Sequence, residues 1–310
     1  MLRPMMIYLS EAQWAKAIVT NVAPARRAAR RFVAGETLDE AIAVAQELKT
    51  KGMTTTLNHL GEHVHTEAEA VEAADAYCHI LERAAASGLD ATVSVKLTQL
   101  GLEMSERFCL DLTRRIVEQA QARRLKVTID MESSNHTEAT LRIYHTLLDE
   151  CGCKNVGVVT QAYLYRTEAD MKALAAAGAR VRLCKGAYKE PPTIAYPNKR
   201  DVDNNFAYLM TLFLNPEAIA AGAYLEVATH DERMIDAAKH HARQHGIGPD
   251  QFEFQMLYGV RPRLQAQLVE EGYQMRIYVP FGTRWYPYFM RRMAENPANL
   301  WFMVNTIWRE

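Results

Sequence analysis

Eight short β-rich runs alternate with amphipathic helical segments along most of this chain of 310 residues. The runs cover residues 54–60, 91–98, 126–131, 155–161, 179–185, 224–229, 252–257 and 274–280. Parallel strands of a (β/α)8 barrel are each followed by a helix, and such a barrel typically extends over about 250 residues. The alternation therefore predicts an α/β fold of the TIM-barrel type rather than an open, doubly wound sheet.

Helix start and stop signals lie between the β-rich runs. The predicted starts are Thr37 with Glu40, Thr66 with Glu69, Thr167 with Asp170, and Pro262, and the predicted ends are Gly52, Gly88, Gly178 and Gly272. Two further helices are predicted before Thr37, around residues 11–21 and after Pro24. We therefore expect an N-terminal helical extension of residues 1–52, a barrel of residues 53–298, and a C-terminal tail helix of residues 299–310.

The composition excludes several classes of protein. The chain has 36 basic and 37 acidic residues, and its formal net charge of −1 provides no general attraction to nucleic acid. Five cysteines, an odd number, do not indicate a disulfide framework, so we expect a reducing cytoplasm. No segment approaches the roughly 20 apolar residues of a membrane span. Peripheral contact with the inner face of the cell membrane stays open as an alternative, and so does assembly into a homo-oligomer.

Nearly every β-rich run ends in polar or charged residues. They are Asn58, Glu62, Lys96, Asp130, Glu132, Gln161, Arg182, Lys185, Thr229, His230, Gln255, Tyr258 and Tyr278. The carboxyl ends of the strands of a TIM barrel form one rim, where the active sites of this fold lie. We therefore predict that these side chains meet at a single site.

A helix with two adjacent arginines directly follows the eighth run. Pro287 suits its first turn, and Asn296-Pro297 predicts its end. Helical spacing places four side chains on one face: Tyr288, Arg291, Arg292 and Glu295. Because a guanidinium binds a carboxylate through two parallel hydrogen bonds, this face predicts an anion-binding helix over the rim. The alternative is an exposed basic helix face.

The rim contains no nucleophile in a recognisable elbow and no glycine-rich nucleotide loop, which indicates that a cofactor carries the difficult step. In the segment from Lys185 to Tyr188, Gly186 and Ala187 would let a flat ring approach the backbone. Arg182 lies on the same run and would donate to that ring, because reduction leaves negative charge on it.

Nine segments, in order, resemble the proline dehydrogenase family, and the similarity is to its short monofunctional bacterial form. They are residues 60–62 (LGE), 94–97 (SVKL), 129–132 (IDME), 161–166 (QAYLYR), 182–188 (RLCKGAY), 228–230 (ATH), 252–255 (FEFQ), 276–280 (RIYVP) and 288–295 (YFMRRMAE). The resemblance implies a distorted (β/α)8 barrel that holds FAD noncovalently. It also implies oxidation of L-proline to 1-pyrroline-5-carboxylate by hydride transfer, with a membrane quinone as the electron acceptor.

The resemblance also implies roles for individual residues. The proline carboxylate would be held by Lys96, Arg291 and Arg292, and the pyrrolidine ring would be walled by Leu257, Tyr278 and Tyr288. Asp130 would orient Tyr278, and Arg182 would donate to the flavin N5 edge. The other contacts with FAD would come from Met131, Gln161, Lys185, Gly186, Ala187, Tyr188, Thr229 and His230, with Lys199 near the phosphate or adenosine. Glu62 would pair with Arg291 as a gate when substrate is absent.

Alternative interpretations stay open at this point. Residues 59–63 match the inverted zinc-protease pattern His-x-x-Glu-His, although Gly61 disfavours the helix that this pattern needs. A metal-dependent hydrolase could use His59, Asp130 and His230, and a noncatalytic barrel could simply bind an amino acid. Asp231, where the family pattern favours Asn, is a departure that could alter the grip on the cofactor. In residues 299–310 an apolar face would pack on the barrel or another subunit, or touch a membrane.

Overall fold

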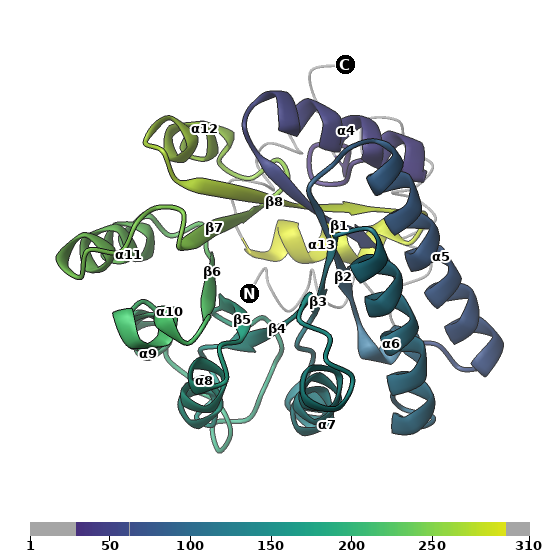
Figure 1. The fold of residues 1–310 in the computed structure, drawn as a ribbon, viewed down its shortest axis with the longest axis horizontal. Helices are drawn as coiled ribbons and strands as arrows, with labels where there is room; N and C mark the ends of the chain where they lie inside the picture. Colours follow the sequence, from purple (N-terminus) through teal and green to yellow (C-terminus); the bar gives the residue numbers. More distant parts are fainter. Residues whose placement is uncertain (1–28, 62, 296–310) are drawn as a thin grey trace.

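Eight parallel strands close into a barrel in the computed structural model, which describes residues 29–61 and 63–295 (Figure 1). The strands are β1 (Thr54–His59), β2 (Ala91–Val95), β3 (Lys126–Ile129), β4 (Val156–Gln161), β5 (Arg180–Cys184), β6 (Tyr224–Ala228), β7 (Phe252–Leu257) and β8 (Gln274–Phe281). Strand β1 pairs with β2 on one side and with β8 on the other, both in parallel. The predicted barrel is confirmed.

Helices surround the strands, as expected for this fold (Figure 1). They are α4 (Leu38–Thr50), α5 (Glu67–Ala86), α6 (Glu106–Ala122), α7 (Ser134–His145), α8 (Thr167–Ala176), α9 (Lys199–Phe213), α10 (Pro216–Ala220), α11 (Glu232–Gln244), α12 (Pro262–Glu270) and α13 (Trp285–Glu295). A short 3-10 helix, η1 (Leu97–Leu100), follows β2, and a π-helical turn, η2 (Thr146–Glu150), follows α7. The helix predicted around residues 11–21, the start of the one predicted after Pro24 and the tail of residues 299–310 lie outside the described residues.

Two of the predicted helix starts have the expected capping boxes. The hydroxyl of Thr37 accepts from the backbone of Glu40, whose side chain accepts in return, and Thr66 and Glu69 form the same arrangement. Helix α8 begins at Thr167 as predicted, but Thr167 does not cap it. The N-cap of α8 is Arg166, and the Thr167 hydroxyl donates 2.6 Å to the carbonyl of Gln161, which ties the helix to the end of β4.

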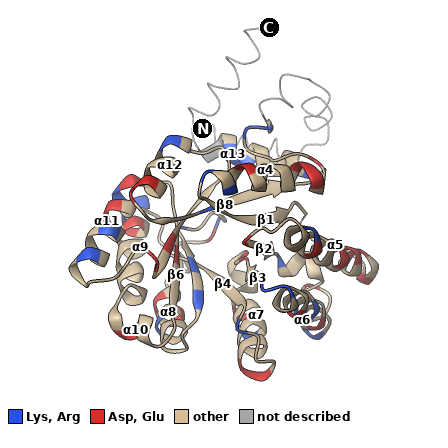
Figure 2. Cartoon of the chain, turned by 45° about the horizontal axis from the view of Figure 1, so that its top comes forward, with Lys and Arg blue, Asp and Glu red and all other residues tan. Residues whose placement is uncertain are grey.

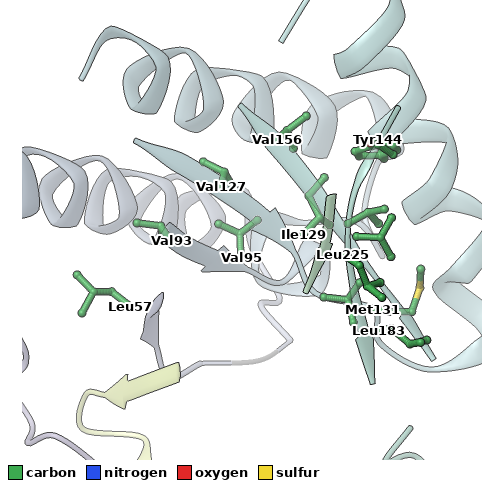
Figure 3. Packing of buried hydrophobic residues seen from close by; sticks show 14 of the residues in the cluster. Leu57, Val93, Val95, Val127, Ile129, Met131, Tyr144, Val156, Leu183 and Leu225 are labelled. Carbon is green, nitrogen blue, oxygen red and sulfur yellow. The ribbon is translucent and has the colours of Figure 1, made fainter. Parts of the chain in front are cut away.

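The main core lies between the outer face of the barrel and the helices. Val93 and Val95 on β2 and Val127 and Ile129 on β3 are completely buried in this layer (Figure 3). Alternate residues of a strand point to opposite faces, so the residues between them point into the barrel. Many of these inward-pointing residues are polar, and Figure 2 shows charged residues on the strands, for example on β6, as well as on the helices.

Helix α13 belongs to a second hydrophobic cluster. Trp285 and Phe289 of α13 pack with Phe32 and Val33 from the segment before α4. The indole nitrogen of Trp285 donates a hydrogen bond of 3.0 Å to Glu36. These contacts fix α13 on the barrel beside the end of β8.

Candidate active site at the carboxyl ends of the strands

Asp130, the residue after β3, is the centre of the site. Its Oδ1 accepts from the Ser94 hydroxyl at 2.5 Å and from Arg182 Nη1 at 3.0 Å. Its Oδ2 accepts from Lys96 Nζ at 2.7 Å and from the Tyr278 hydroxyl at 3.1 Å. Strands β2, β3, β5 and β8 therefore bring their side chains to one buried carboxylate through the interior of the barrel.

The charges of this centre stabilise one another. Burial alone would raise the pKa of Asp130, but Lys96 and Arg182 hold it below its ordinary value. Burial would likewise lower the pKa of Lys96, yet the Asp130 carboxylate raises it well above its ordinary value. Burial, and then the Asp130 charge, raise the pKa of Tyr278, whose hydroxyl therefore stays a neutral donor. Lysine and aspartate both keep their charges in the folded protein.

Arg182 is fixed on three sides. Its Nε donates 2.6 Å to Gln255 Oε1, and its Nη1 donates to Ser94 as well as to Asp130. The guanidinium also lies 5.5 Å from the centre of the Tyr278 ring. Within the described part of the chain, the buried Nη2 has no hydrogen-bond partner. A buried cationic N–H without a partner is unfavourable, so this donor indicates an acceptor that binds here.

Helix α13 approaches the same site from the end of β8. Tyr288 is buried, and the guanidinium carbon of Arg292 lies 5.1 Å from the centre of its ring. Burial is the main cause of the raised pKa of Tyr278, and Tyr288 adds a smaller contribution. Burial is also the main cause of the lowered pKa of His230, and Arg292 adds to it. Arg291 is half-buried. Glu62, its predicted gate partner, lies outside the described residues.

A group of ion pairs occupies the rim beyond β5 and β6. Lys185 Nζ donates to Asp203 at 2.5 Å and to Asp231 at 2.7 Å, and Lys199 Nζ donates to Asp203 at 2.5 Å. Lys185 is largely enclosed, whereas the Lys199 side chain is 75% exposed. Asp231, the departure from the family pattern, is thus a direct partner of Lys185.

The remaining predicted contacts with the cofactor lie at the ends of β3 to β6. Gln161 Nε2 donates a hydrogen bond of 3.3 Å to the carbonyl of Met131. The buried Oε1 of Gln161 has no hydrogen-bond partner among the described residues. The Thr229 hydroxyl accepts from the backbone of Asp231 at 3.1 Å. Ala187 and Tyr188 are exposed, and Tyr188 contributes to the raised pKa of Lys96, after Asp130 and Tyr278.

Gly186 has a backbone conformation and surroundings that only glycine tolerates. Its φ is +107°, and a Cβ atom would lie 2.2 Å from the ring of Tyr163. We expect Gly186→Ala to reduce the free energy of unfolding by about 2 to 4 kcal/mol, from strain and overlap together. Gly246→Ala is the matched control, because its φ is +67° with nothing within 4 Å, so it tests strain alone. Urea unfolding that gives equal losses for both variants would contradict the steric argument.

His230 acts as a neutral acceptor. Its Nε2 accepts from the backbone N–H of Leu257 at 3.0 Å, which fixes the end of β7. Burial, with smaller contributions from Arg292 and Arg261, lowers the pKa of His230 to about 4. In the unfolded chain His230 is protonated as the pH falls below its ordinary pKa of 6.5. In the folded chain it is protonated only as the pH approaches about 4.

The free energy of unfolding should therefore fall as the pH decreases from 6.5 to 4, with up to roughly 3 kcal/mol attributable to His230. We expect His230→Gln, which keeps an acceptor but does not titrate, to lose less stability over this window than the wild-type chain. Urea unfolding at both ends of the window measures the difference. Parallel losses in the two proteins would show that His230 is not buried in its neutral form.

Ser94 and Glu226 were not among the polar strand ends predicted to meet at the site, and Gln255 was predicted there without a role of its own. Ser94 binds both Asp130 and Arg182, while Gln255 and Glu226 lie against the other side of Arg182. Ser94 precedes Lys96 by two residues and Gln255 precedes Leu257 by two, so each shares a strand face with a predicted site residue. This alternation was the signal that could have identified Ser94 and the role of Gln255.

The residues of the metal-dependent alternatives have other surroundings. His59 ends β1 and packs on Phe281, with ring centres 5.4 Å apart, and His63 pairs with Glu103 at 3.3 Å. Asp130 is engaged by Lys96 and Arg182. Among the residues that the structure describes, no group of three or more His, Cys, Asp or Glu side chains could hold a metal ion.

The fold and the site together define a TIM-barrel enzyme with a buried carboxylate, lysine, arginine and tyrosine at the carboxyl ends of its strands. A sequence model described as "Proline dehydrogenase" matches residues 41–305. The chain therefore belongs to the proline dehydrogenase family.

Similar proteins include both short and long members. The chain is 42% identical to proline dehydrogenase 1 of Bacillus subtilis subsp. natto over 99% of each protein. It is 44% identical to a proline dehydrogenase of Deinococcus radiodurans, over 89% of this chain and 88% of the relative. The crystal structure of proline utilization A (PutA) from Bdellovibrio bacteriovorus, inactivated by N-propargylglycine, superposes with a TM-score of 0.82 at 29% identity. That match covers 91% of this chain and 34% of the longer protein.

Proposed function

We propose that this chain catalyses the first step of proline catabolism, using FAD to oxidise L-proline to 1-pyrroline-5-carboxylate. Family membership supports the dehydrogenation of proline. The observation that carries the finer proposal is the buried Arg182 guanidinium. It is fixed by Asp130 and Gln255 with Nη2 left open, next to Lys96 and Tyr278.

The residues at the ends of β4 and β5 fit a flavin. Arg182 Nη2 is a buried donor and Gln161 Oε1 a buried acceptor, and neither has a partner among the described residues. A polar ring edge would satisfy both. Gly186, whose missing Cβ leaves room for the Tyr163 ring, would contribute backbone atoms only. When bound, FAD supplies the two-electron acceptor for the hydride. We assign Met131, Lys185, Ala187, Tyr188, Thr229 and His230 to its other contacts, with Lys199 at its outer end.

The substrate residues would orient proline. Lys96 bonds Asp130 within the site, and Arg292 on α13 lies over the Tyr288 ring and lowers the pKa of His230, after burial; we assign both cations, together with Arg291, to the carboxylate. Tyr278, Tyr288 and Leu257 would wall the ring. Hydride transfer needs the donor carbon within about 3 to 3.5 Å of the acceptor, so fixing the carboxylate at several points converts binding into orientation.

We further propose that a membrane quinone accepts the electrons and that Glu62 closes on Arg291 when proline is absent. The division into residues 1–52, 53–298 and 299–310 is part of this proposal, with reaction in the cytoplasm or at the inner membrane face. None of the described helices is long and apolar enough to cross a membrane. Flotation with liposomes, with and without residues 299–310, tests the tail as a contact, and equal flotation excludes it.

Steady-state assay of the purified protein tests the function. We expect a yellow protein that releases FAD on denaturation and reduces a water-soluble quinone only when L-proline is present. The product should be trapped as a cyclic imine by an aromatic amino aldehyde. A flavin-free preparation that takes up no FAD would contradict the cofactor assignment, and binding of proline without quinone reduction would favour a noncatalytic barrel.

A further inference from the structure

Gln255 on β7 connects Arg182 with a layer of ion pairs deeper in the barrel. Its Oε1 accepts from Arg182 Nε at 2.6 Å. Its Nε2 donates to Glu226 at 2.5 Å and to Glu253 at 2.7 Å. The glutamine is 4% exposed, so these contacts are made away from water.

The two carboxylates fix the orientation of the amide. A carboxylate accepts hydrogen bonds and a guanidinium donates them, so the amide nitrogen must face Glu226 and Glu253 while the oxygen faces Arg182. The reversed amide would oppose acceptor to acceptor and donor to donor. Gln255 therefore has one favourable orientation, and it presents its oxygen to Arg182 Nε.

The layer beneath Gln255 is itself held in place. Arg276 donates 2.7 Å to Glu253, and Arg180 lies 3.2 Å from Glu253 and also contacts Glu226. Burial would raise the pKa of Glu253, but Arg276 and Arg180 hold it below its ordinary value, so its charge is kept. Four strands, β5 to β8, contribute to this support.

Glu226 also competes for Arg182. Its Oε2 lies 3.5 Å from Arg182 Nε, beyond the hydrogen bond that Gln255 makes with the same atom. Without the amide, the guanidinium would be drawn toward Glu226 and would turn its Nη2 away from the rim. Gln255 therefore bonds both of these oppositely charged groups and takes the place of a direct hydrogen bond between them.

We propose that Gln255 is a positioning residue that aims Arg182 Nη2 at the cofactor and holds the guanidinium out of a direct hydrogen bond with Glu226. The inference rests on the proposed flavin function. It predicts that Gln255 influences hydride transfer and flavin reduction potential rather than proline binding, because the carboxylate-binding residues Lys96 and Arg292 are not its partners.

The first test replaces the amide with an apolar chain of similar length, Gln255→Met. We expect kcat to fall about 10- to 100-fold, as when a group that orients a catalytic side chain is removed. The KM for proline should be unchanged, and the flavin midpoint potential should shift to more negative values, because Arg182 stabilises the reduced ring less. Gln274→Met is the matched control, since Gln274 begins β8 at the opposite end of the barrel and bonds Tyr224 and Asp250.

The second test, Gln255→Glu, keeps size and shape. In its protonated form the new carboxyl can donate to Glu226 or Glu253 and accept from Arg182, as the amide does. In its ionised form it would repel Glu226 and Glu253 and neutralise Arg182, while Arg180 and Arg276 stay in their places. We expect kcat and the flavin potential, each relative to wild type at the same pH, to approach wild-type values at low pH and to fall as pH rises.

The outcomes separate this inference from the proposed function. A wild-type protein without flavin overturns the function on which the inference rests. A wild-type flavoprotein whose Gln255→Met variant keeps its kcat and midpoint potential overturns the role of Gln255 alone. If Gln255→Met does not fold, the pH dependence of Gln255→Glu decides, and a ratio to wild type that is constant with pH contradicts the proposal.

Discussion

Asp130→Ala is expected to abolish most of the activity and to destabilise the fold at the same time. The substitution leaves Lys96 and Arg182 as buried cations without the carboxylate that both contact. Removal of one partner from a buried ion pair typically costs about 3 to 5 kcal/mol of stability. We expect kcat/KM for proline to fall about 10³-fold, because Arg182 and Tyr278 lose the group that orients them. Urea unfolding and steady-state kinetics measure the two effects.

A graded series makes this expectation specific. Asp130→Asn keeps one acceptor oxygen, which can serve Ser94 on one side or Tyr278 on the other but not both, and it removes the charge, so it should lie between the wild-type chain and Asp130→Ala in both measurements. Asp39→Ala is the surface control, because Asp39 pairs with Arg83 at 2.6 Å on an exposed face and should affect neither. Wild-type kinetics in Asp130→Ala would remove Asp130 from the centre of the site.

Lys96→Ala and Arg292→Ala are each expected to lower kcat/KM for proline. The expected loss of transition-state stabilisation is about 2 to 5 kcal/mol, the range for truncating one partner of a buried, hydrogen-bonded charge pair. Both residues would bind the proline carboxylate, and Lys96 additionally supports Asp130. We therefore expect Arg292→Ala to act mainly through KM, whereas Lys96→Ala lowers kcat as well. Initial rates over a range of proline concentrations resolve the two parameters.

A substrate without a carboxylate isolates this contribution. With pyrrolidine in place of proline, the wild-type chain and Arg292→Ala should have similar kcat/KM values, because the group that Arg292 binds is missing. Arg263→Ala, on the exposed face of α12, should behave as wild type with both substrates. An equal loss with proline and pyrrolidine would contradict carboxylate binding by Arg292 and indicate a role in holding α13.

The barrel was predictable because its signals are local. Thr37 and Thr66 start helices through contacts within four residues. The strands can be recognised from their own runs of β-forming residues. The errors arose where contacts with residues distant in the sequence determine where an element begins or ends. The run of residues 91–98 was predicted as one strand, yet β2 ends at Val95, because Glu132 accepts from the backbone and hydroxyl of Thr98 and stabilises η1.

The position of the site in the fold could be predicted from the sequence, but the hydrogen bonds and ion pairs within it could not. Residues such as Asp130 and Arg182 follow from the rule that polar strand ends meet at one rim. The hydrogen bonds from Arg182 to Ser94 and Gln255 depend on which strands face each other across the barrel, and a single sequence does not contain that information. The pairing of Lys185 with Asp203 likewise joins residues 18 positions apart.

Anaerobic mixing of the purified protein with L-proline, while the flavin absorbance is followed, tests the central claim most directly. We predict rapid loss of the oxidised flavin band at a rate that saturates with proline, a slower loss in Arg292→Ala, and restoration of the band when a quinone is added. A flavin that stays oxidised at saturating L-proline would contradict the assignment of this site to proline oxidation.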